Sequence, residues 1–371
     1  MSMRYEVAEI ERMLSPSLVI FRDLVEENLR KMVAIAGDVS RLRPHAKTHK
    51  MPAMVRLETA HGITKHKCAT LAEAEMLAEC GVRDIFLAYN LVGPNIGRAV
   101  EFRQKYPETE LMVTVDHEKP LQELGDAMKG AGTSIGVLLD IDTGQHRTGL
   151  EVGARAKELY GAIARTKGVR AAGLHVYDGH QHQKDLAERR TAVLGQFQQV
   201  LVFRDELRKS GYDVPRMVCG GTASFPIYAE QTDPTIELSP GTCVFHDAGY
   251  GESFPDLAFV PAACILTRVV SRPTEDRVTF DLGYKAAASD PPAGRRLVFP
   301  NLPDAEQVLQ NEEHLVIKTS QAGKYQPGAT DWAIPRHICP SVALHKWAYV
   351  VSDGHLCETW AIVARDRQIT L

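Results

Sequence analysis

The segment RPHAKTHK, residues 43–50, concentrates groups that can do chemistry, because it holds three basic residues and two histidines. A lysine becomes a nucleophile toward carbonyl groups when burial or neighbouring cations lower its pKa. Lys47 stands in the middle of this segment, and Arg43, His45 and His49 could contribute such an effect. By composition alone, a basic loop exposed to solvent is the commoner interpretation.

Two further segments could bind an anion through glycine-rich turns. Backbone N–H groups exposed where a strand ends and a turn begins form a nest suited to a phosphate. The stretch GGTASF, residues 220–225, follows a predicted strand in this way, and HDAGYG, residues 246–251, is a second such turn. Either turn taken alone also fits an ordinary tight loop.

His337 and Cys339 form an H-x-C pair in a segment that we expect to be a β-strand. Residues two apart on a strand point to the same side, so the imidazole and the thiolate could hold one metal ion. Two ligands are too few for a stable zinc site, so water or substrate would have to complete the coordination. Without other support, such a pair would be a chance occurrence.

The elements that must position these residues follow an alternating pattern from about residue 16 to 245. Nearly continuous apolar runs, typical of strands buried on both faces, alternate with longer amphipathic stretches. The expected strands are 17–21, 84–89, 111–116, 135–142, 171–177 and 217–221, and the expected helices include 24–37, 71–81, 154–168 and 188–211.

Repeated strand–helix units favour a (β/α)8 barrel over an open doubly wound sheet. Functional residues of such barrels lie at the C-terminal ends of the strands. Several unusual residues fall at such positions, namely Lys47, Asp140, Asp142, Tyr177, His180, Gly220 and Gly221.

After about residue 250 the pattern changes to β segments separated by turns, with little helical periodicity. We therefore predict an α/β protein with two domains. Residues 16–250 form the barrel, and residues 251–371, together with roughly residues 1–15, form a second, mainly β domain.

Composition excludes several classes of function. The net charge is −4 and the basic residues are scattered, which argues against nucleic acid as a partner. No apolar run is long enough for a membrane helix, and the N-terminal segment has no features of a secretory signal. Seven cysteines at irregular spacing do not form a disulfide framework, so we expect a reducing, cytoplasmic location.

Four segments in order resemble the D-threonine aldolase and D-serine dehydratase family. They are RPHAKTHK, DTGQHRTG (142–149), GGTASF and PRHICPSV (335–342), and the resemblance extends from residue 15 to residue 367. The family comprises pyridoxal-phosphate enzymes with an alanine-racemase-like barrel. The resemblance implies that pyridoxal 5'-phosphate is held as a Schiff base on Lys47.

The resemblance also implies roles for other residues of the cofactor site. Arg147 would lie near the cofactor ring and Tyr177 would approach it, although a surface arginine and a core tyrosine are the alternatives. Lys47 and His45 would belong to the same site. The implied phosphate contacts are Gly220, Gly221 and Thr222, with Gly249 and Tyr250 in the second turn.

His337 and Cys339 resemble the family's metal site beside the cofactor. A thiolate is softer than a carboxylate, so we expect zinc, with manganese or magnesium as alternatives. In the aldolases, a histidine works with metal-bound water as the base on the substrate hydroxyl. Because the local spacing differs, both His180 and His182 are candidates, and we prefer His182; an exposed histidine pair in a polar loop is the alternative.

The resemblance implies a lyase that acts on a small β-hydroxy-D-amino acid. Our first expectation is the D-threonine aldolase type, which cleaves the substrate to glycine and an aldehyde. The alternative is the D-serine dehydratase type, which yields a 2-oxo acid and ammonia. The His337-x-Cys339 pair resembles the H-x-C of the dehydratases, whereas low-specificity D-threonine aldolases have H-x-D at this position. An amino-acid racemase or a non-catalytic cofactor carrier is less favoured. The resemblance further implies a homodimer.

Overall fold

The computed structural model describes residues 5–371, so residues 1–4 of the predicted N-terminal contribution to the β domain lie outside the described residues. The chain divides into two compact units. The barrel unit comprises Met32–Lys47, Val55–Gly241 and Asp366–Leu371, and the β unit comprises the residues up to Lys31, Thr48–Met54 and Thr242–Arg365. No helix among residues 5–371 is long and apolar enough to cross a membrane.

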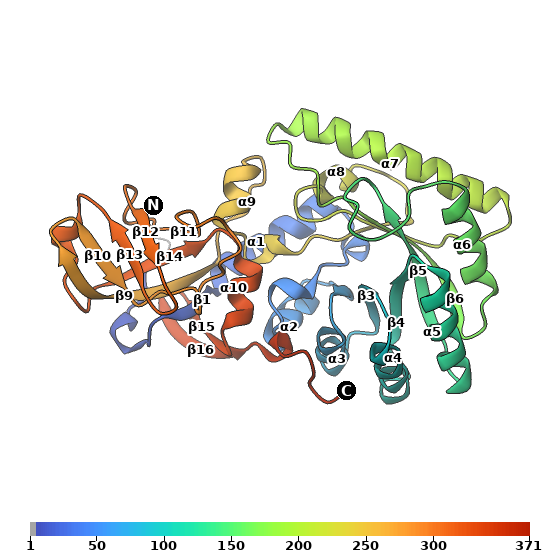
Figure 1. Cartoon of the computed structure of the whole chain (residues 1–371), viewed down its shortest axis with the longest axis horizontal. Helices are drawn as coiled ribbons and strands as arrows, with labels where there is room; N and C mark the ends of the chain where they lie inside the picture. The colour runs from blue at the N-terminus through green and yellow to red at the C-terminus, as the bar shows by residue number, and fades with distance from the viewer. Residues whose placement is uncertain (1–4) are drawn as a thin grey trace. The chain divides into compact units, whose positions relative to one another are not determined.

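The barrel unit is built on seven parallel strands that neighbour one another in chain order (Figure 1). Helices follow the strands along the chain and cover the outside of the sheet. The strands are β2 (Lys65–Cys68), β3 (Asp84–Asn90), β4 (Glu110–Val115), β5 (Ile135–Asp142), β6 (Val169–Tyr177), β7 (Met217–Cys219) and β8 (Ile236–Leu238). The helices are α3 (Leu71–Glu79), α4 (Pro94–Lys105), α5 (Glu118–Gly130), α6 (Ala154–Arg165), α7 (Leu186–Lys209) and α8 (Phe225–Ala229).

Residues 42–45 connect the two edges of this sheet. Leu42 forms a parallel bridge with Leu238 of β8, and His45 forms one with Lys67 of β2. The N–H of Lys67 donates to Pro44 at 2.8 Å. The segment therefore takes the place of an eighth strand, and the predicted alanine-racemase-like barrel is confirmed. Lys47 follows directly after this closing segment.

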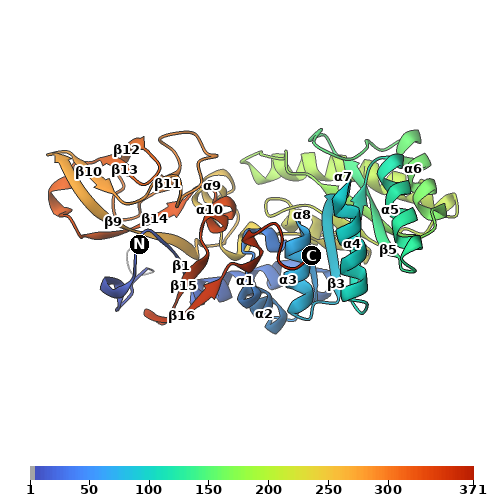
Figure 2. The same ribbon diagram turned by 60° about the horizontal axis from the view of Figure 1, so that its bottom comes forward.

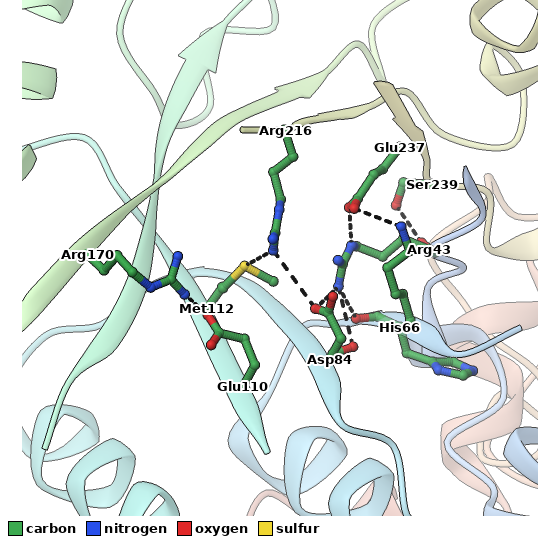
Figure 3. Close-up of polar contacts among 10 residues, drawn as sticks. Arg43, His66, Asp84, Glu110, Met112, Arg170, Arg216, Glu237 and Ser239 are labelled. Carbon is green, nitrogen blue, oxygen red and sulfur yellow. Dashed lines mark hydrogen bonds and ion pairs between the residues drawn. The ribbon is translucent and has the colours of Figure 1, made fainter. Parts of the chain in front are cut away.

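A buried ion-pair network stabilises the N-terminal end of the barrel strands (Figure 3). The guanidinium of Arg43 is fully buried, and it donates to Glu237 at 2.5 Å and to Asp84 at 2.8 Å. Lys65 reaches the same Glu237 carboxylate at 2.9 Å. Because two carboxylates balance the charge of Arg43, the geometry does not support the expectation that Arg43 acts on Lys47.

The β unit contains a nine-stranded sheet (Figure 2). Its main path runs β12-β13-β10-β9-β1-β15-β16, and β14 pairs with β9 and β11. The strands are β1 (Ser17–Phe21), β9 (Ala263–Thr274), β10 (Arg277–Phe280), β11 (Leu297–Val298), β12 (Glu306–Gln310), β13 (Leu315–Lys318), β14 (Thr330–Pro335), β15 (Trp347–Ser352) and β16 (His355–Ala361). This unit also holds the short helices α9 (Ala248–Ser253) and α10 (Ile338–Leu344).

The remaining helices connect these elements. Helices α1 (Arg22–Ala36) and α2 (Pro52–Ala60) contain residues of both units. Single 3-10 turns are η2 (Ile10–Arg12), η3 (Val39–Arg41), η4 (Ala46–Thr48), η5 (Thr242–Val244), η6 (Ala322–Lys324) and η7 (Val363–Arg365).

One predicted strand belongs to the other sheet. The segment Ser17–Phe21 was expected among the alternating barrel strands, but it pairs in parallel with β15 and antiparallel with β9 in the β unit. All five of its residues are buried. An uninterrupted apolar run predicts a strand covered on both faces, but it contains no information about which strands lie beside it.

Candidate active site

Lys47 lies in the 3-10 turn η4, immediately beyond the segment that closes the barrel. Its backbone N–H donates to Nδ1 of His45 at 3.3 Å. His45 is buried and Lys47 is half-buried. Lys47 therefore stands at the C-terminal end of a strand-like segment, where barrel enzymes place their functional groups.

Four residues gather at the same end of the barrel, three on the neighbouring strands β5 and β6 and one in the loop after β5. Nδ1 of His175 lies 2.7 Å from Oδ1 of Asp140. The rings of His175 and Tyr177 are parallel, with an interplanar angle of 3° and centroids 6.5 Å apart. The guanidinium of Arg147 lies 4.9 Å from the centroid of the Tyr177 ring. The structure thus brings together the predicted pair, Arg147 and Tyr177, and adds His175.

The His175–Asp140 pair is buried, and its surroundings determine which residue is charged and which nitrogen of His175 donates. Burial would raise the pKa of Asp140, but the charge and hydrogen bond of His175 lower it below its usual value. Burial lowers the pKa of His175. A neutral His175 that donates from Nδ1 to an ionised Asp140 keeps Nε2 as an acceptor. That Nε2 is buried and has no hydrogen-bond partner within residues 5–371.

The glycines of GGTASF allow close packing. Gly220 has φ +72°, and an added Cβ would lie 2.8 Å from Oγ of Ser224. Its N–H donates to the carbonyl of Val176, and the N–H of Gly221 donates to Oγ of Ser224. Both N–H groups therefore have partners in this structure, one on strand β6 and one within the loop, and the roles of Gly220, Gly221 and Thr222 as phosphate contacts stay a prediction. Thr222 is buried, and its Oγ1 accepts from Gly241.

The second turn, HDAGYG, forms the start of helix α9 in the β unit. The carboxylate of Asp247 caps this helix and accepts from the N–H of Tyr250 at 2.8 Å. An added Cβ on Gly249 would lie 2.3 Å from the carbonyl oxygen of Arg336, so glycine is required for packing. The roles of Gly249 and Tyr250 as phosphate contacts stay a prediction.

His337 and Cys339 lie close together, although not on a strand as expected. Strand β14 ends at Pro335, His337 is the N-cap of α10, and Cys339 lies in the first turn of that helix. The prediction of a shared strand face is therefore wrong. The sequence allows this start because Pro340 is tolerated in a first helical turn, where its missing N–H has no partner to lose.

The charged groups around His337 and Cys339 suit a bound cation, although these two residues alone do not complete the coordination of a metal ion. Burial lowers the pKa of His337, but hydrogen bonds and charges of Cys339 and Asp290 outweigh it and raise the pKa to about 9. Sγ of Cys339 lies 3.3 Å from the Thr48 hydroxyl and 3.6 Å from that of Thr242. Within residues 5–371 no group of three or more His, Cys, Asp or Glu side chains could hold an ion. The donors fit a metal with two protein ligands, whose remaining positions water or substrate would fill.

The two candidate histidines after β6 have different surroundings. Nε2 of His180 lies 3.1 Å from the side-chain nitrogens of both Gln181 and Gln196, the latter on α7. His182 is exposed and has no side-chain hydrogen bond among the described residues. His180 is thus hydrogen-bonded to two glutamines, whereas the side chain of His182 is exposed to solvent.

The residues of the barrel unit fit pyridoxal phosphate. Lys47 offers an amine at the barrel mouth, and His175 offers a buried Nε2 with no partner in the described part of the chain. Gly221 keeps the loop close to Tyr177, because a Cβ there would lie 3.2 Å from the tyrosine ring. His175 was not predicted from the sequence, although it stands two residues before Tyr177 on one strand and so shares its side of the sheet.

Comparisons with known proteins agree with this architecture. Residues 20–248 match the family model of the alanine racemase N-terminal domain, and residues 262–351 match a serine dehydratase domain. The chain is 33% identical over 365 residues to a D-threonine aldolase of Arthrobacter sp, covering 96% of this chain and 94% of the relative. It is 25% identical over 371 residues to a D-threo-3-hydroxyaspartate dehydratase of Delftia sp. (strain HT23), covering 93% and 96%. The crystal structure of the D-threonine aldolase from Filomicrobium marinum superposes with a TM-score of 0.89 at 29% identity, covering 96% of both chains.

Proposed function

This chain belongs to the D-threonine aldolase and D-serine dehydratase family of alanine-racemase-like, pyridoxal-phosphate-dependent lyases, and from that premise we propose that it cleaves β-hydroxy-D-amino acids by the D-threonine aldolase reaction. The carrying observation is the 33% identity to a D-threonine aldolase along 96% of the chain. The position of Lys47 at the end of the closing strand supports this proposal.

The residues of the barrel unit have defined tasks in this proposal. Lys47 would hold the cofactor through its amine. When bound, pyridoxal phosphate supplies an electron sink for charge at the substrate Cα. Tyr177 and His175, which lie on β6, and Arg147, in the loop after β5, would orient the cofactor ring. The buried Asp140 keeps the His175 ring in one tautomer.

The β unit contributes the metal in this proposal. His337 and Cys339 would hold a divalent ion, for which zinc is our first choice because the thiolate is a soft ligand. Such an ion would act as a Lewis acid toward the β-hydroxyl of the substrate. We assign the removal of the hydroxyl proton to His182, because His180 is held by two glutamines.

Dehydration is the second candidate, and Cys339 is the observation that favours it. The family resemblance associates H-x-C with dehydratases, and a D-threo-3-hydroxyaspartate dehydratase is among the relatives. In that reaction Lys47 would take the Cα proton and the β-hydroxyl would leave as hydroxide, after which water would hydrolyse the released enamine to the 2-oxo acid and ammonia.

The products separate the two reactions. The purified protein, loaded with pyridoxal phosphate, is incubated with D-threonine, D-serine and 3-hydroxy-D-aspartate in the presence of Zn²⁺ or Mn²⁺. Glycine and an aldehyde support the proposed function, whereas a 2-oxo acid and ammonia establish the dehydratase. If none of the three substrates is turned over with either metal, the lyase proposal is overturned.

A further inference from the structure

Lys67 is a buried lysine at the mouth of the barrel to which the proposed function gives no task. It lies on β2 and is 3% exposed. Its Nζ is 5.7 Å from the centroid of the Tyr177 ring, within the range of about 6 Å for a cation–π contact. Its backbone pairs with His45 in the closing segment. Lys67 therefore stands beside the residues that we assign to the cofactor.

The ammonium group of Lys67 has no hydrogen-bond acceptor in the part of the chain that the structure describes. Within residues 5–371 it makes the contact with the Tyr177 ring, but no hydrogen bond or ion pair. Of the nearby carboxylates, Asp140 is bonded to His175, and Oδ1 of Asp178 accepts from Ser224 at 2.7 Å, whereas Oδ2 of Asp178 is buried without a hydrogen-bond partner within residues 5–371 and makes no bond with Lys67. Burying a charged amine without such a partner is unfavourable unless another group supplies the compensation.

The pKa of Lys67 depends on the charges around its amine. Burial, reinforced by the charge of Lys47, lowers the pKa of Lys67 to about 7, and Asp178 and Asp140 only partly oppose that effect. An anionic oxygen that arrived beside Nζ would favour the charged form and would gain a charge-assisted hydrogen bond.

We propose that Lys67 is a second functional lysine of the site, whose ammonium binds an anionic oxygen supplied either by pyridoxal phosphate or by the carboxylate of the substrate. The inference rests on the assignment of Lys47 as the cofactor lysine. Because Lys67 has a role in binding, its replacement should weaken binding of the cofactor or of the substrate carboxylate. Lys47 should still form its bond with the cofactor. A purely structural lysine would instead affect only the stability of the barrel.

The test compares three full-length variants with the wild type. Lys67→Met removes the charge, Lys67→Arg keeps it, and Lys65→Met is the matched control. Lys65 lies two residues earlier on the same strand and pairs with Glu237. Circular dichroism first establishes that each variant is folded. If Lys67→Met does not fold, Lys67→Gln, which keeps a donor without the charge, is measured in its place.

Two measurements distinguish the source of the anion. The first follows the visible absorbance of the cofactor–lysine bond as pyridoxal phosphate is added, which gives the dissociation constant of the cofactor. The second measures the binding of 3-hydroxybutyrate, a carboxylate without an amino group, to the loaded protein. Losing one charge-assisted hydrogen bond should weaken binding about tenfold or more in one of the two measurements. We expect Lys67→Arg to retain most of the affinity and Lys65→Met to match the wild type.

The outcomes also separate this inference from the proposed function. A loss for Lys67→Met in the cofactor measurement identifies a cofactor oxygen, and a loss for 3-hydroxybutyrate alone identifies the substrate carboxylate. If a folded Lys67→Met variant binds both ligands within about twofold of the wild type, the inference is overturned while the proposed function stands. If the wild type itself gives no visible band with pyridoxal phosphate, the assignment of Lys47 fails as well.

Discussion

Nδ1 of His337 lies 2.5 Å from a carboxylate oxygen of Asp290, and this contact gives the imidazole a fixed direction. A histidine that donates from one ring nitrogen to a carboxylate presents the other nitrogen as a ligand. The two residues are 47 positions apart in the chain, and no spacing pattern in the sequence connects them. If His337 binds a metal as we propose, Asp290 would be a positioning residue that acts through this contact.

Replacing Asp290 should weaken metal binding before it affects the cofactor. Loss of a carboxylate behind a metal-bound histidine commonly costs about 10–100-fold in affinity, and we expect a loss in that range for Asp290→Ala. Asp290→Asn should lose less, because its amide oxygen still accepts. Competition with a chromophoric zinc chelator measures the affinity. Asp276→Ala, which removes an exposed carboxylate elsewhere in the β unit, is the control; equal zinc affinity in Asp290→Ala and wild type would contradict the assignment.

The identity of residue 339 should determine which metal binds best. Cys339→Asp exchanges a soft thiolate for a hard carboxylate, so the preference should move from zinc toward manganese. The measurement is the ratio of zinc to manganese affinity, obtained with the same chelator method. Cys357→Asp changes the exposed cysteine of the same unit and should leave the ratio unaltered. A ratio in Cys339→Asp equal to that of the wild type would show that Cys339 is not a ligand.

Lys47→Ala should abolish the visible absorbance of the loaded protein, because no other lysine is assigned to the bond with the cofactor. Lys31→Ala, which removes an amine paired with Glu27 on α1, should keep the band. Absorbance spectra after addition of pyridoxal phosphate and removal of the excess provide the measurement. A band of wild-type intensity in Lys47→Ala would refute the central assignment.

The two histidines beyond β6 should respond differently to substitution. If His182 takes the hydroxyl proton, His182→Ala should lower kcat for D-threonine by about 10²–10⁴-fold, the usual size of general base catalysis. His180→Ala removes a ring held by Gln181 and Gln196 and should reduce kcat much less. Steady-state kinetics of glycine release measure both. A larger loss of kcat in His180→Ala would transfer the role to that residue.

The sequence predicts the strand ends of the barrel well, because buried parallel strands consist of apolar runs. Strands β3 to β7 coincide with the expected segments, and Tyr177 closes β6 as expected. Strand β2 was not predicted, because three of its four residues, in KHKC, are basic or histidine and no apolar run marks it. His66 and Lys67 are nevertheless buried and Lys65 is half-buried, with His66 paired to Glu58 and Lys65 to Glu237.

The site residues that the sequence missed are those defined by contacts between distant segments. His175 could have been found, because it stands two positions before Tyr177 on the same strand. Asp290 could not, because a loop residue acquires its role only from the position of His337. The helical geometry of Cys339 was also missed, because the adjacent Pro340 obscures helical periodicity.

Glu237 should stabilise the barrel through the fully buried Arg43, and this effect should depend on pH. Burial would raise the pKa of Glu237, but the charges of Arg43 and Lys65 lower it from 4.5 to about 2. A carboxyl group whose pKa is lower in the folded state stabilises the protein above its unfolded pKa, and this contribution is lost as the pH falls toward the folded pKa. Removing one partner of a buried ion pair leaves an uncompensated charge, so Glu237→Gln should cost about 3 kcal/mol of unfolding free energy at pH 7. The difference from the wild type should shrink between pH 4.5 and about pH 2.

Urea unfolding of the full chain, followed by circular dichroism, measures this difference; fluorescence is unsuitable because all three tryptophans lie in the β unit. Glu110→Gln is the control, since Glu110 pairs with Arg170 in the exposed part of the same region (Figure 3). An exposed pair contributes about 1 kcal/mol or less, so that variant should unfold almost as the wild type does. If Glu237→Gln and Glu110→Gln lose the same free energy of unfolding at pH 7, the buried ion pair of Arg43 does not stabilise the protein more than the exposed pair does.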